Sequence, residues 1–134
     1  MFEFLEKRKI WLVYIPLAIY WLILFTATSL PAYDLPKLGL SDKLQHFGAF
    51  LILAVLLNLA LLYQRKSRFL FENAIIATII ICLLYAGLDE LHQMFIPGRF
   101  AELLDWVADG SGVILGVFLV YFLKTKLNYN FEFN

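Results

Sequence analysis

The chain has 134 residues, of which 62% are hydrophobic, 17% aromatic and 16% charged, and its formal net charge is zero. Soluble domains carry about 25% charged residues, so this composition disfavours a soluble protein. A chain without net positive charge also lacks the electrostatic footprint of a nucleic-acid-binding protein, and we expect no nucleic-acid partner. The single cysteine, Cys82, lies in an apolar stretch and excludes both an intrachain disulfide and a cysteine zinc motif.

Four apolar blocks predict four membrane-spanning helices. They cover about residues 10–30, 44–63, 69–88 and 103–123. Each block is close to the roughly 20 residues that a helix needs to cross the hydrocarbon core of a bilayer. Backbone breakers lie between the blocks, at Pro31, Pro36 and Pro97. The sequence therefore predicts an all-α integral membrane protein, a four-helix bundle that forms a single domain over residues 1–134.

The first block has a competing interpretation as a secretory signal peptide. Three basic residues precede it, and Ala27-Thr28-Ser29 weakly resembles a cleavage site. The apolar region of a signal peptide is usually only about 7–15 residues long. This block is longer and contains the bulky side chains of Trp11 and Trp21. We therefore expect it to be retained as a span.

Basic residues near the helix ends predict the orientation, because cytoplasmic loops carry an excess of lysine and arginine. Eight fall on one side: Lys7, Arg8, Lys9, Arg65, Lys66, Arg68, Lys124 and Lys126. Three fall on the other: Lys37, Lys43 and Arg99. We therefore expect both termini in the cytoplasm, and the loops over residues 31–43 and 89–102 outside.

Ionisable groups from three separate segments are expected at this outer face. Asp42, Lys43 and His46 begin the second span, Asp89, Glu90, His92 and Gln93 follow the third, and Arg99, Glu102, Asp105 and Asp109 lead into the fourth. Asp105, Asp109, Gly112 and Gly116 follow helical spacing and form one stripe on the fourth span. Because small residues allow a neighbouring helix to approach closely, the carboxylates of this stripe should point into the bundle. We therefore expect the polar residues of this face to line an outward-facing polar pocket.

Asp109 is the most informative of these residues. The apolar run after it is too short to cross a membrane alone, so Asp109 should lie about one turn inside the hydrocarbon boundary. A lone carboxylate there costs about 2.5–3.5 kcal/mol, and such groups are candidate functional groups. Arg99, Lys43 and His46 are the available cationic partners. The carboxylates outnumber them, so one carboxyl keeps its proton or a cation binds there.

Other residues of the outer face have structural interpretations as well. Asp42 follows Ser41 at a predicted helix start, where free amide groups and the helix dipole favour an acid. His46 can be an interfacial histidine that is hydrogen-bonded to a neighbour. Arg99 can anchor its loop to lipid headgroups or pair with a nearby acid.

A metal site is a further possibility at this face. His46 with Glu90, Asp105 and Asp109 offers nitrogen and oxygen ligands that suit a divalent ion. No local spacing of the His-Glu-x-x-His kind supports such a site. The sequence alone therefore assigns no metal ligands, and the cofactor stays unknown.

Two stretches carry a resemblance to a known family. The first is Asp42-Lys43-Leu44-Gln45-His46-Phe47, which an apolar span follows. The second runs from Tyr85 to Gly116 and contains an acid-x-x-Gln pattern, a Pro-Gly-Arg turn and the spaced Asp/Gly series. Together they resemble the signatures of VanZ-like membrane proteins. The chain differs from the family pattern at Asp109, where the family often has asparagine, and at Glu102, where a small hydroxyl residue is common.

The resemblance implies a multi-pass protein of the bacterial cytoplasmic membrane. The family takes its name from a protein that gives low-level resistance to the glycopeptide antibiotic teicoplanin. It implies a cell-envelope role on the outer leaflet, with membrane lipids or a lipid-linked envelope molecule as the partner. The oligomeric state is not predicted.

Three functions fit these observations. The first is an enzyme or modifying factor that acts on an amphiphilic, lipid-linked substrate. Its expected acid/base groups are Glu90, Asp105, Asp109 and His46, and its expected substrate-binding residues are Asp42, Lys43, Gln93 and Arg99. The second is a non-catalytic binder of a lipid or glycopeptide. The third, a small ion- or proton-coupled transporter, is disfavoured because the ionisable groups stop at one membrane face.

Overall fold

The computed structural model describes residues 1–31, 33, 39 and 41–133. Pro36 and Lys37, which the sequence analysis places in an outer loop, lie outside the described residues. The helices are α1 (Phe2–Lys7), η1 (Ile10–Tyr14), α2 (Ile15–Ser29), α3 (Asp42–Tyr63), α4 (Arg68–Glu72), α5 (Ala74–Gln93) and α6 (Leu103–Lys126). The described residues form no strand.

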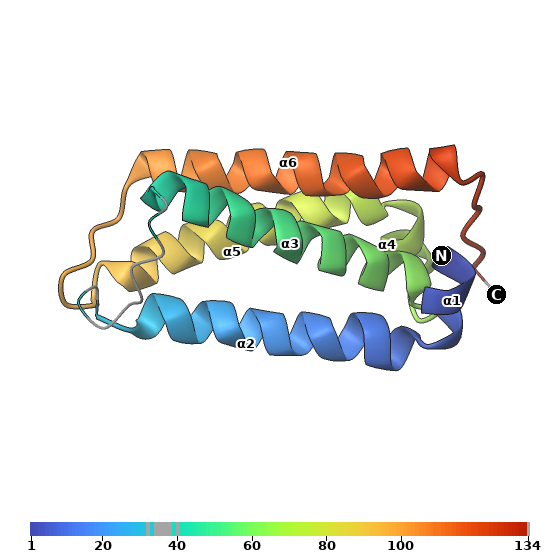
Figure 1. Ribbon diagram of the computed structural model, residues 1–134, viewed down its shortest axis with the longest axis horizontal. Helices are drawn as coiled ribbons and strands as arrows, with labels where there is room; N and C mark the ends of the chain where they lie inside the picture. Colours follow the sequence, from blue (N-terminus) through green and yellow to red (C-terminus); the bar gives the residue numbers. More distant parts are fainter. Residues whose placement is uncertain (32, 34–38, 40, 134) are drawn as a thin grey trace.

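Four helical segments are long and apolar enough to cross a bilayer. They are Ile10–Ser29, Asp42–Tyr63, Ala74–Gln93 and Leu103–Lys126. Figure 1 shows them side by side, with consecutive spans running in opposite directions, so that α3 and α6 run parallel, and with both ends of the chain at one end of the bundle. Large apolar side chains cover the outside, as expected for helices whose outer faces contact lipid. The prediction of an all-α, four-helix membrane protein is thereby confirmed.

The third span begins later than expected. It starts at Ala74, whereas the apolar block predicts a start near residue 69. Asn73 separates it from the short helix α4: its backbone N–H and its side-chain amide both donate to the Phe69 carbonyl, at 3.0 and 2.9 Å. An asparagine side chain that bonds to the backbone in this way competes with helix continuation.

This shift changes the position of the polar residues at the other end of the same helix. Asp89, Glu90 and Gln93 were expected just beyond the third span, but they lie in the last turns of α5. All three side chains are buried against neighbouring helices rather than exposed in a loop.

The first span packs loosely against the rest of the bundle. Its π-helical turn η1 precedes Pro16 of α2, where proline has no N–H and crowds the carbonyl of the preceding turn. A wide turn relieves that conflict. Helix α2 has no fully buried residue, whereas each of the other three spans contributes several. Helix α2 is therefore packed less tightly against the bundle than the other three long helices.

Helices α3 and α6 make the closest contact in the structure. A Cβ atom at Gly112 would lie 2.2 Å from the Phe47 carbonyl oxygen, and one at Gly116 would lie 2.6 Å from the Leu51 carbonyl oxygen. Only glycine allows the two backbones to approach this closely. The predicted small-residue stripe therefore faces α3, and it brings the carboxylates on the same face of α6 against the start of α3.

Candidate functional site

The candidate site lies at the loop end of the bundle, opposite the two ends of the chain (Figure 1). There α3 begins, α5 ends and α6 begins. Four side chains from these helices gather there, and we call them the polar cluster: His46, Glu90, Asp105 and Asp109. Asp109 is fully buried, and the other two carboxylates are less than one tenth exposed. The cluster is therefore largely shielded from solvent.

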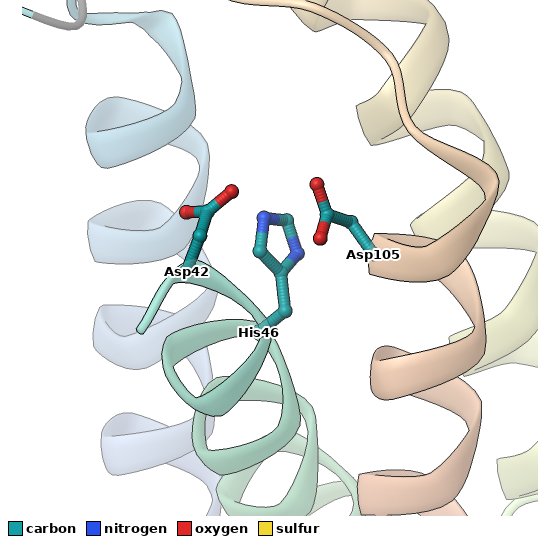
Figure 2. A group of neighbouring side chains, drawn as sticks. All are labelled: Asp42, His46 and Asp105. Carbon is teal, nitrogen blue, oxygen red and sulfur yellow. The ribbon is translucent and has the colours of Figure 1, made fainter. Parts of the chain in front are cut away.

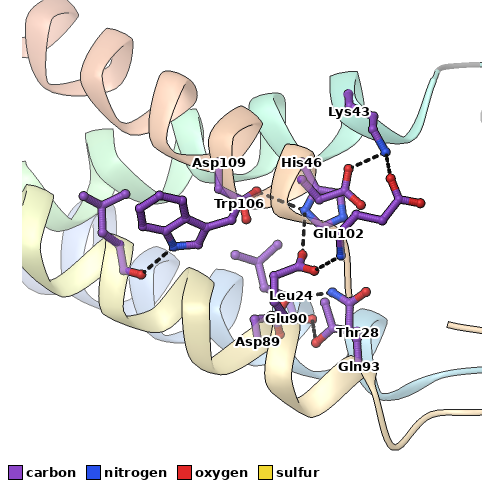
Figure 3. A network of polar contacts seen from close by, with 12 residues as sticks. Leu24, Thr28, Lys43, His46, Asp89, Glu90, Gln93, Glu102, Trp106 and Asp109 are labelled. Carbon is purple, nitrogen blue, oxygen red and sulfur yellow. Dashed lines mark hydrogen bonds and ion pairs between the residues drawn. The ribbon is translucent and has the colours of Figure 1, made fainter. Parts of the chain in front are cut away.

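His46 is at the centre of the cluster. Its Nδ1 atom lies 3.0 Å from Oδ1 of Asp109 and 3.9 Å from Oε1 of Glu90 (Figure 3). With a proton on Nδ1, the imidazole donates a hydrogen bond to the Asp109 carboxylate. Figure 2 shows the same ring between the carboxylates of Asp42 and Asp105. Four carboxylates on three helices therefore surround one imidazole.

The start of α3 determines the position of this imidazole. The side chain of Ser41 accepts a hydrogen bond from the backbone N–H of Leu44 at 3.3 Å and caps the helix. Asp42, the first helical residue, is exposed and lies one turn before His46, on the same face. The capping interpretation of this segment thus applies to Ser41, with Asp42 in the favourable first turn.

Lys43 connects α3 to the start of α6. Its Nζ atom lies 2.8 Å from Oδ1 of Asp105 and also contacts the Glu102 carboxylate. The lysine side chain is partly exposed, whereas the Asp105 side chain is buried. Lys43 therefore compensates the charge of Asp105 from the edge of the cluster.

Glu90 is held in place by the polypeptide backbone. Its Oε2 atom accepts a hydrogen bond from the backbone N–H of Glu102 at 2.9 Å, just before α6 (Figure 3). Its other oxygen, Oε1, has no hydrogen-bond partner among the described residues, and the same holds for Oδ2 of Asp109. Buried polar atoms are nearly always paired, so these two oxygens need an explanation.

A pocket of about 800 Å³ opens beside the cluster, between α2, α3 and α5. Its apolar wall includes Tyr20, Leu24, Leu44, Phe50, Tyr85 and Phe100. Its polar lining includes Asp42, His46, Asp89, Gln93, Arg99 and Glu102. The volume is within the range of about 300–1,000 Å³ of small-molecule sites. Of the polar cluster, His46 lines this pocket, while the three carboxylates lie behind it.

Asp89 and Gln93 form a second polar pair in the pocket wall. The Gln93 side-chain amide donates to Oδ2 of Asp89 at 3.0 Å, and both side chains are buried (Figure 3). The two residues are one helical turn apart on α5. The pair offers additional hydrogen-bonding groups to a ligand without contacting His46.

Arg99 attaches its loop to the end of α2. Its guanidinium donates to the Ala27 carbonyl at 2.9 Å and to the Leu30 carbonyl at 3.4 Å. Carbonyls in the last turn of a helix lack intrahelical partners, so Arg99 supplies hydrogen bonds to carbonyls that the helix itself leaves unpaired. His92 contacts the same helix end, with its Nε2 atom 3.0 Å from Oγ of Ser29.

A comparison of the sequence with protein-family models identifies one family. The model of the VanZ/LLP1 family matches residues 4–124, which is most of the chain. The chain belongs to the VanZ/LLP1 family. Its four apolar helices make it a multi-pass membrane protein. No curated protein and no solved structure matched in the corresponding searches.

The VanZ/LLP1 chain brings most of the predicted site residues together. Glu90, Asp105, Asp109 and His46 form the polar cluster, Lys43 borders it, and Asp42, Gln93 and Arg99 line the pocket. Their functional roles stay predictions. The polar residues predict a polar pocket but not its apolar wall, for which Tyr20 offers a local signal: a tyrosine hydroxyl in an apolar span usually has a partner, here the Ala49 carbonyl at 2.9 Å.

Among the described residues of this VanZ/LLP1 protein, two groups of side chains bring three possible metal ligands close together. Each offers one ligand atom per residue, and the atoms lie within 4.8 Å of one another. One group is Asp42, His46 and Asp105, and the other is His46, Glu90 and Asp109. The second group is largely buried and includes two carboxylate oxygens that lack a hydrogen-bond partner, Oε1 of Glu90 and Oδ2 of Asp109.

Proposed function

We propose that the protein binds an amphiphilic, lipid-linked component of the bacterial cell envelope in the pocket and modifies it with the polar cluster. The position of His46 carries this proposal. It lines the pocket on one side and is hydrogen-bonded to buried Asp109 on the other. Ionisable groups beside a pocket of mixed polarity are typical of sites for acid/base chemistry.

The lining of the pocket supports an amphiphilic ligand. Leu24 and Phe50 offer an apolar surface that suits an acyl or prenyl chain. The carboxylates of Asp42, Asp89 and Glu102 accept hydrogen bonds, which suits a headgroup rich in hydroxyl or ammonium groups. A sugar-bearing or amine-bearing headgroup therefore fits better than a bare phosphate.

The loose packing of α2 supports access from the bilayer. This helix forms one wall of the pocket and contributes no fully buried residue. A lipid-linked molecule could therefore keep its chain in the membrane beside α2 while its headgroup reaches His46.

The chemical roles follow from the geometry. Asp109 orients the imidazole of His46 through Nδ1, the pairing in which a carboxylate holds a catalytic histidine. Glu90 and Asp105 are additional acid/base groups within the same cluster. Arg99 already donates hydrogen bonds to two carbonyls. Its proposed role is therefore to hold the edge of the pocket in place as well as to contact the ligand.

A transporter is less well supported by the charge distribution. Residues 47–63, 74–88 and 110–123, which continue the three helices away from the cluster, carry no charged side chain. Ion and proton pathways through membrane proteins are usually marked by ionisable groups at intramembrane positions along them. The charge distribution therefore fits a site that binds a ligand at one membrane face better than a pathway for an ion across the bundle.

The cellular setting is part of the proposal. The excess of basic residues at the opposite end favours cytoplasmic termini, with the pocket on the outer leaflet of the bacterial cytoplasmic membrane. Lipid-linked cell-wall precursors and glycopeptide antibiotics meet there. We therefore propose that the protein contributes to teicoplanin resistance by changing such a component.

Incubation of the purified protein with a total envelope lipid extract tests the proposal. Mass spectrometry should detect a product with wild-type protein that is lost in Glu90→Gln and Asp105→Asn. Glu72→Gln, an exposed acid of α4 at the opposite end, is the matched control and should retain full activity. A lipid that co-purifies without any product would contradict catalysis and favour the alternative function, a non-catalytic binder of lipid or glycopeptide.

A susceptibility assay tests the cellular part. Expression of the wild-type chain in a susceptible bacterium should raise the minimal inhibitory concentration of teicoplanin. Glu90→Ala and Asp105→Ala should abolish that rise at equal amounts of folded protein in the membrane. An unchanged rise in both variants would contradict the role of the polar cluster.

A further inference from the structure

We propose that His46, Glu90 and Asp109 bind one divalent transition-metal cation, of which Zn²⁺ is the best match. We call these three residues the buried triad. The inference deepens the proposed function and rests on it for the reaction in the pocket. With the cation bound, Nδ1 of His46 is a ligand without a proton, so the cation takes the place of the hydrogen bond to Asp109, and Asp105 remains the acid/base group. The binding site itself can be tested without any substrate.

The distances within the buried triad suit a small cation. Zn²⁺ lies about 2.0–2.2 Å from its nitrogen and oxygen ligands, which places tetrahedral ligand atoms about 3.4 Å from one another. Nδ1 of His46 is 3.0 Å from Oδ1 of Asp109 and 3.9 Å from Oε1 of Glu90. These two distances bracket the required spacing, and the ligand atoms of all three residues lie within 4.8 Å of one another.

Two unpartnered oxygens indicate that something binds there. Oε1 of Glu90 and Oδ2 of Asp109 are buried and accept no hydrogen bond from the described residues. Both side chains are more than nine-tenths buried. Removing a partner from a buried charge is strongly destabilising, so two adjacent carboxylates in such a place need a counter-charge.

The neighbouring cations that the structure describes do not supply this charge. Lys43 is engaged by Glu102 and Asp105 at the edge of the cluster. Arg99 bonds two carbonyls at the end of α2. A protonated His46 would offset only one of the two triad carboxylates, whereas a dication with neutral His46 offsets both. Metal binding therefore accounts for the charge of the buried triad completely.

The donor set selects the class of metal. One imidazole nitrogen and two carboxylate oxygens suit zinc and other first-row transition metals, whereas Mg²⁺ and Ca²⁺ prefer oxygen ligands alone. Three protein ligands with a remaining open position are typical of catalytic rather than structural zinc. His46 lines the pocket, so the site adjoins the space in which we place the ligand.

A second interaction orients the glutamate. The backbone N–H of Glu102 holds Oε2 of Glu90, which leaves Oε1 on the side of His46. Hydrogen bonds of this kind, which orient a metal ligand, are a regular feature of metal sites. Asp105 lies one turn before Asp109 and is paired with Lys43, so it stays free of the metal and keeps its acid/base role.

Asparagine keeps the size and shape of the Asp109 side chain but removes its charge, and an amide is a weaker metal ligand than a carboxylate. Asp109→Asn is therefore both the sharpest test variant and one that the fold should accept.

Metal analysis of the purified protein is the test. The protein is purified in detergent without a histidine tag and without chelator, and inductively coupled plasma mass spectrometry measures its metal content. The chelator-stripped protein is then titrated with Zn²⁺, Mn²⁺ and Mg²⁺ by calorimetry. We expect about one Zn²⁺ per chain, and an affinity at least about tenfold lower in Asp109→Asn and His46→Gln.

Asp89→Asn is the matched control. Asp89 is a buried carboxylate at the same end of the bundle, but it bonds Gln93 outside the buried triad. It should keep wild-type Zn²⁺ affinity, and circular dichroism and gel filtration should show that all variants are folded. Equal Zn²⁺ affinity in wild type and Asp109→Asn, or no tight Zn²⁺ binding by wild type, would overturn the site.

The outcome is separable from that of the proposed function. A lipid product formed by chelator-stripped protein would overturn a working role for the cation and leave the proposed function standing. Tight Zn²⁺ binding without any lipid product would support the site and contradict the proposed catalysis.

Discussion

His46 and Asp109 lie 63 positions apart in the sequence, yet Nδ1 of the first is 3.0 Å from Oδ1 of the second. The packing of Gly112 against the backbone of α3 makes this contact possible. This packing places the carbonyl of Phe47, the residue after His46, directly against α6. The geometry of the polar cluster therefore depends on a helix contact without side chains.

Gly112→Ala should destabilise the protein and weaken the proposed activity. The added Cβ would lie 2.2 Å from the Phe47 carbonyl oxygen, so α3 and α6 must separate. Overpacking of this kind costs about 1–3 kcal/mol of unfolding free energy. Unfolding in detergent, monitored by circular dichroism, measures the effect.

Gly48→Ala is the control for this experiment. A Cβ at Gly48 would meet no atom within 4 Å, and alanine is favoured over glycine in a helix by about 1 kcal/mol. This variant should be as stable as wild type or more so. A Gly112→Ala variant of wild-type stability would show that the close approach of α3 and α6 is wrong.

The stripe on α6 shows what the sequence can predict. The stripe repeats at helical spacing and consists of Asp105, Asp109, Gly112 and Gly116. Carboxylates in an apolar block avoid lipid, and small residues favour close helix packing, so this face of the helix should turn toward another helix. The structure buries all four residues, as expected. Helical periodicity is a local property, so a single sequence is sufficient to find it.

The start of the third span shows where sequence reasoning fails. Residues 69–93 contain an apolar run without proline, and hydropathy does not determine which 20 residues of it form the span. The break at Asn73 depends on two hydrogen bonds to one carbonyl, a detail of backbone geometry. An outward-facing polar pocket is predicted from the polar residues, but its apolar wall is not, because that wall depends on how α2, α3 and α5 pack and leaves no local pattern.

Arg99→Gln should loosen the end of α2. The variant loses the charged hydrogen bonds to the Ala27 and Leu30 carbonyls, each of which contributes about 1 kcal/mol. Hydrogen exchange measured by mass spectrometry should be about fivefold faster for the peptide that ends α2, because local opening becomes easier. The pocket edge should become more mobile with it.

Arg68→Gln provides the comparison for this measurement. Arg68 pairs with Glu72 on the exposed surface of α4, at the end of the bundle opposite the one where α2 ends (Figure 1). Its loss should leave exchange in α2 unchanged. If Arg99→Gln behaves like Arg68→Gln, the arginine does not hold the end of α2.

The orientation can be tested with single cysteines. Native Cys82 is fully buried and should not react with a membrane-impermeant maleimide. Phe100→Cys, in the exposed loop beside the pocket, should be labelled on intact cells. Lys66→Cys, in the loop between α3 and α4, should be labelled only after permeabilisation. The reverse pattern would place the pocket on the cytoplasmic side and contradict the outer-leaflet proposal.

Occupancy of the pocket by an amphiphile is the central claim, and photo-crosslinking tests it most directly. The protein is reconstituted in lipid nanodiscs with a trace of a diazirine-bearing glycolipid, irradiated, digested and analysed by mass spectrometry. We predict that label concentrates on residues that face the pocket, such as Leu24 and Phe50, and that excess unlabelled glycolipid removes it. Even labelling of outward-facing side chains such as Phe118 and Phe122, without competition, would contradict the claim.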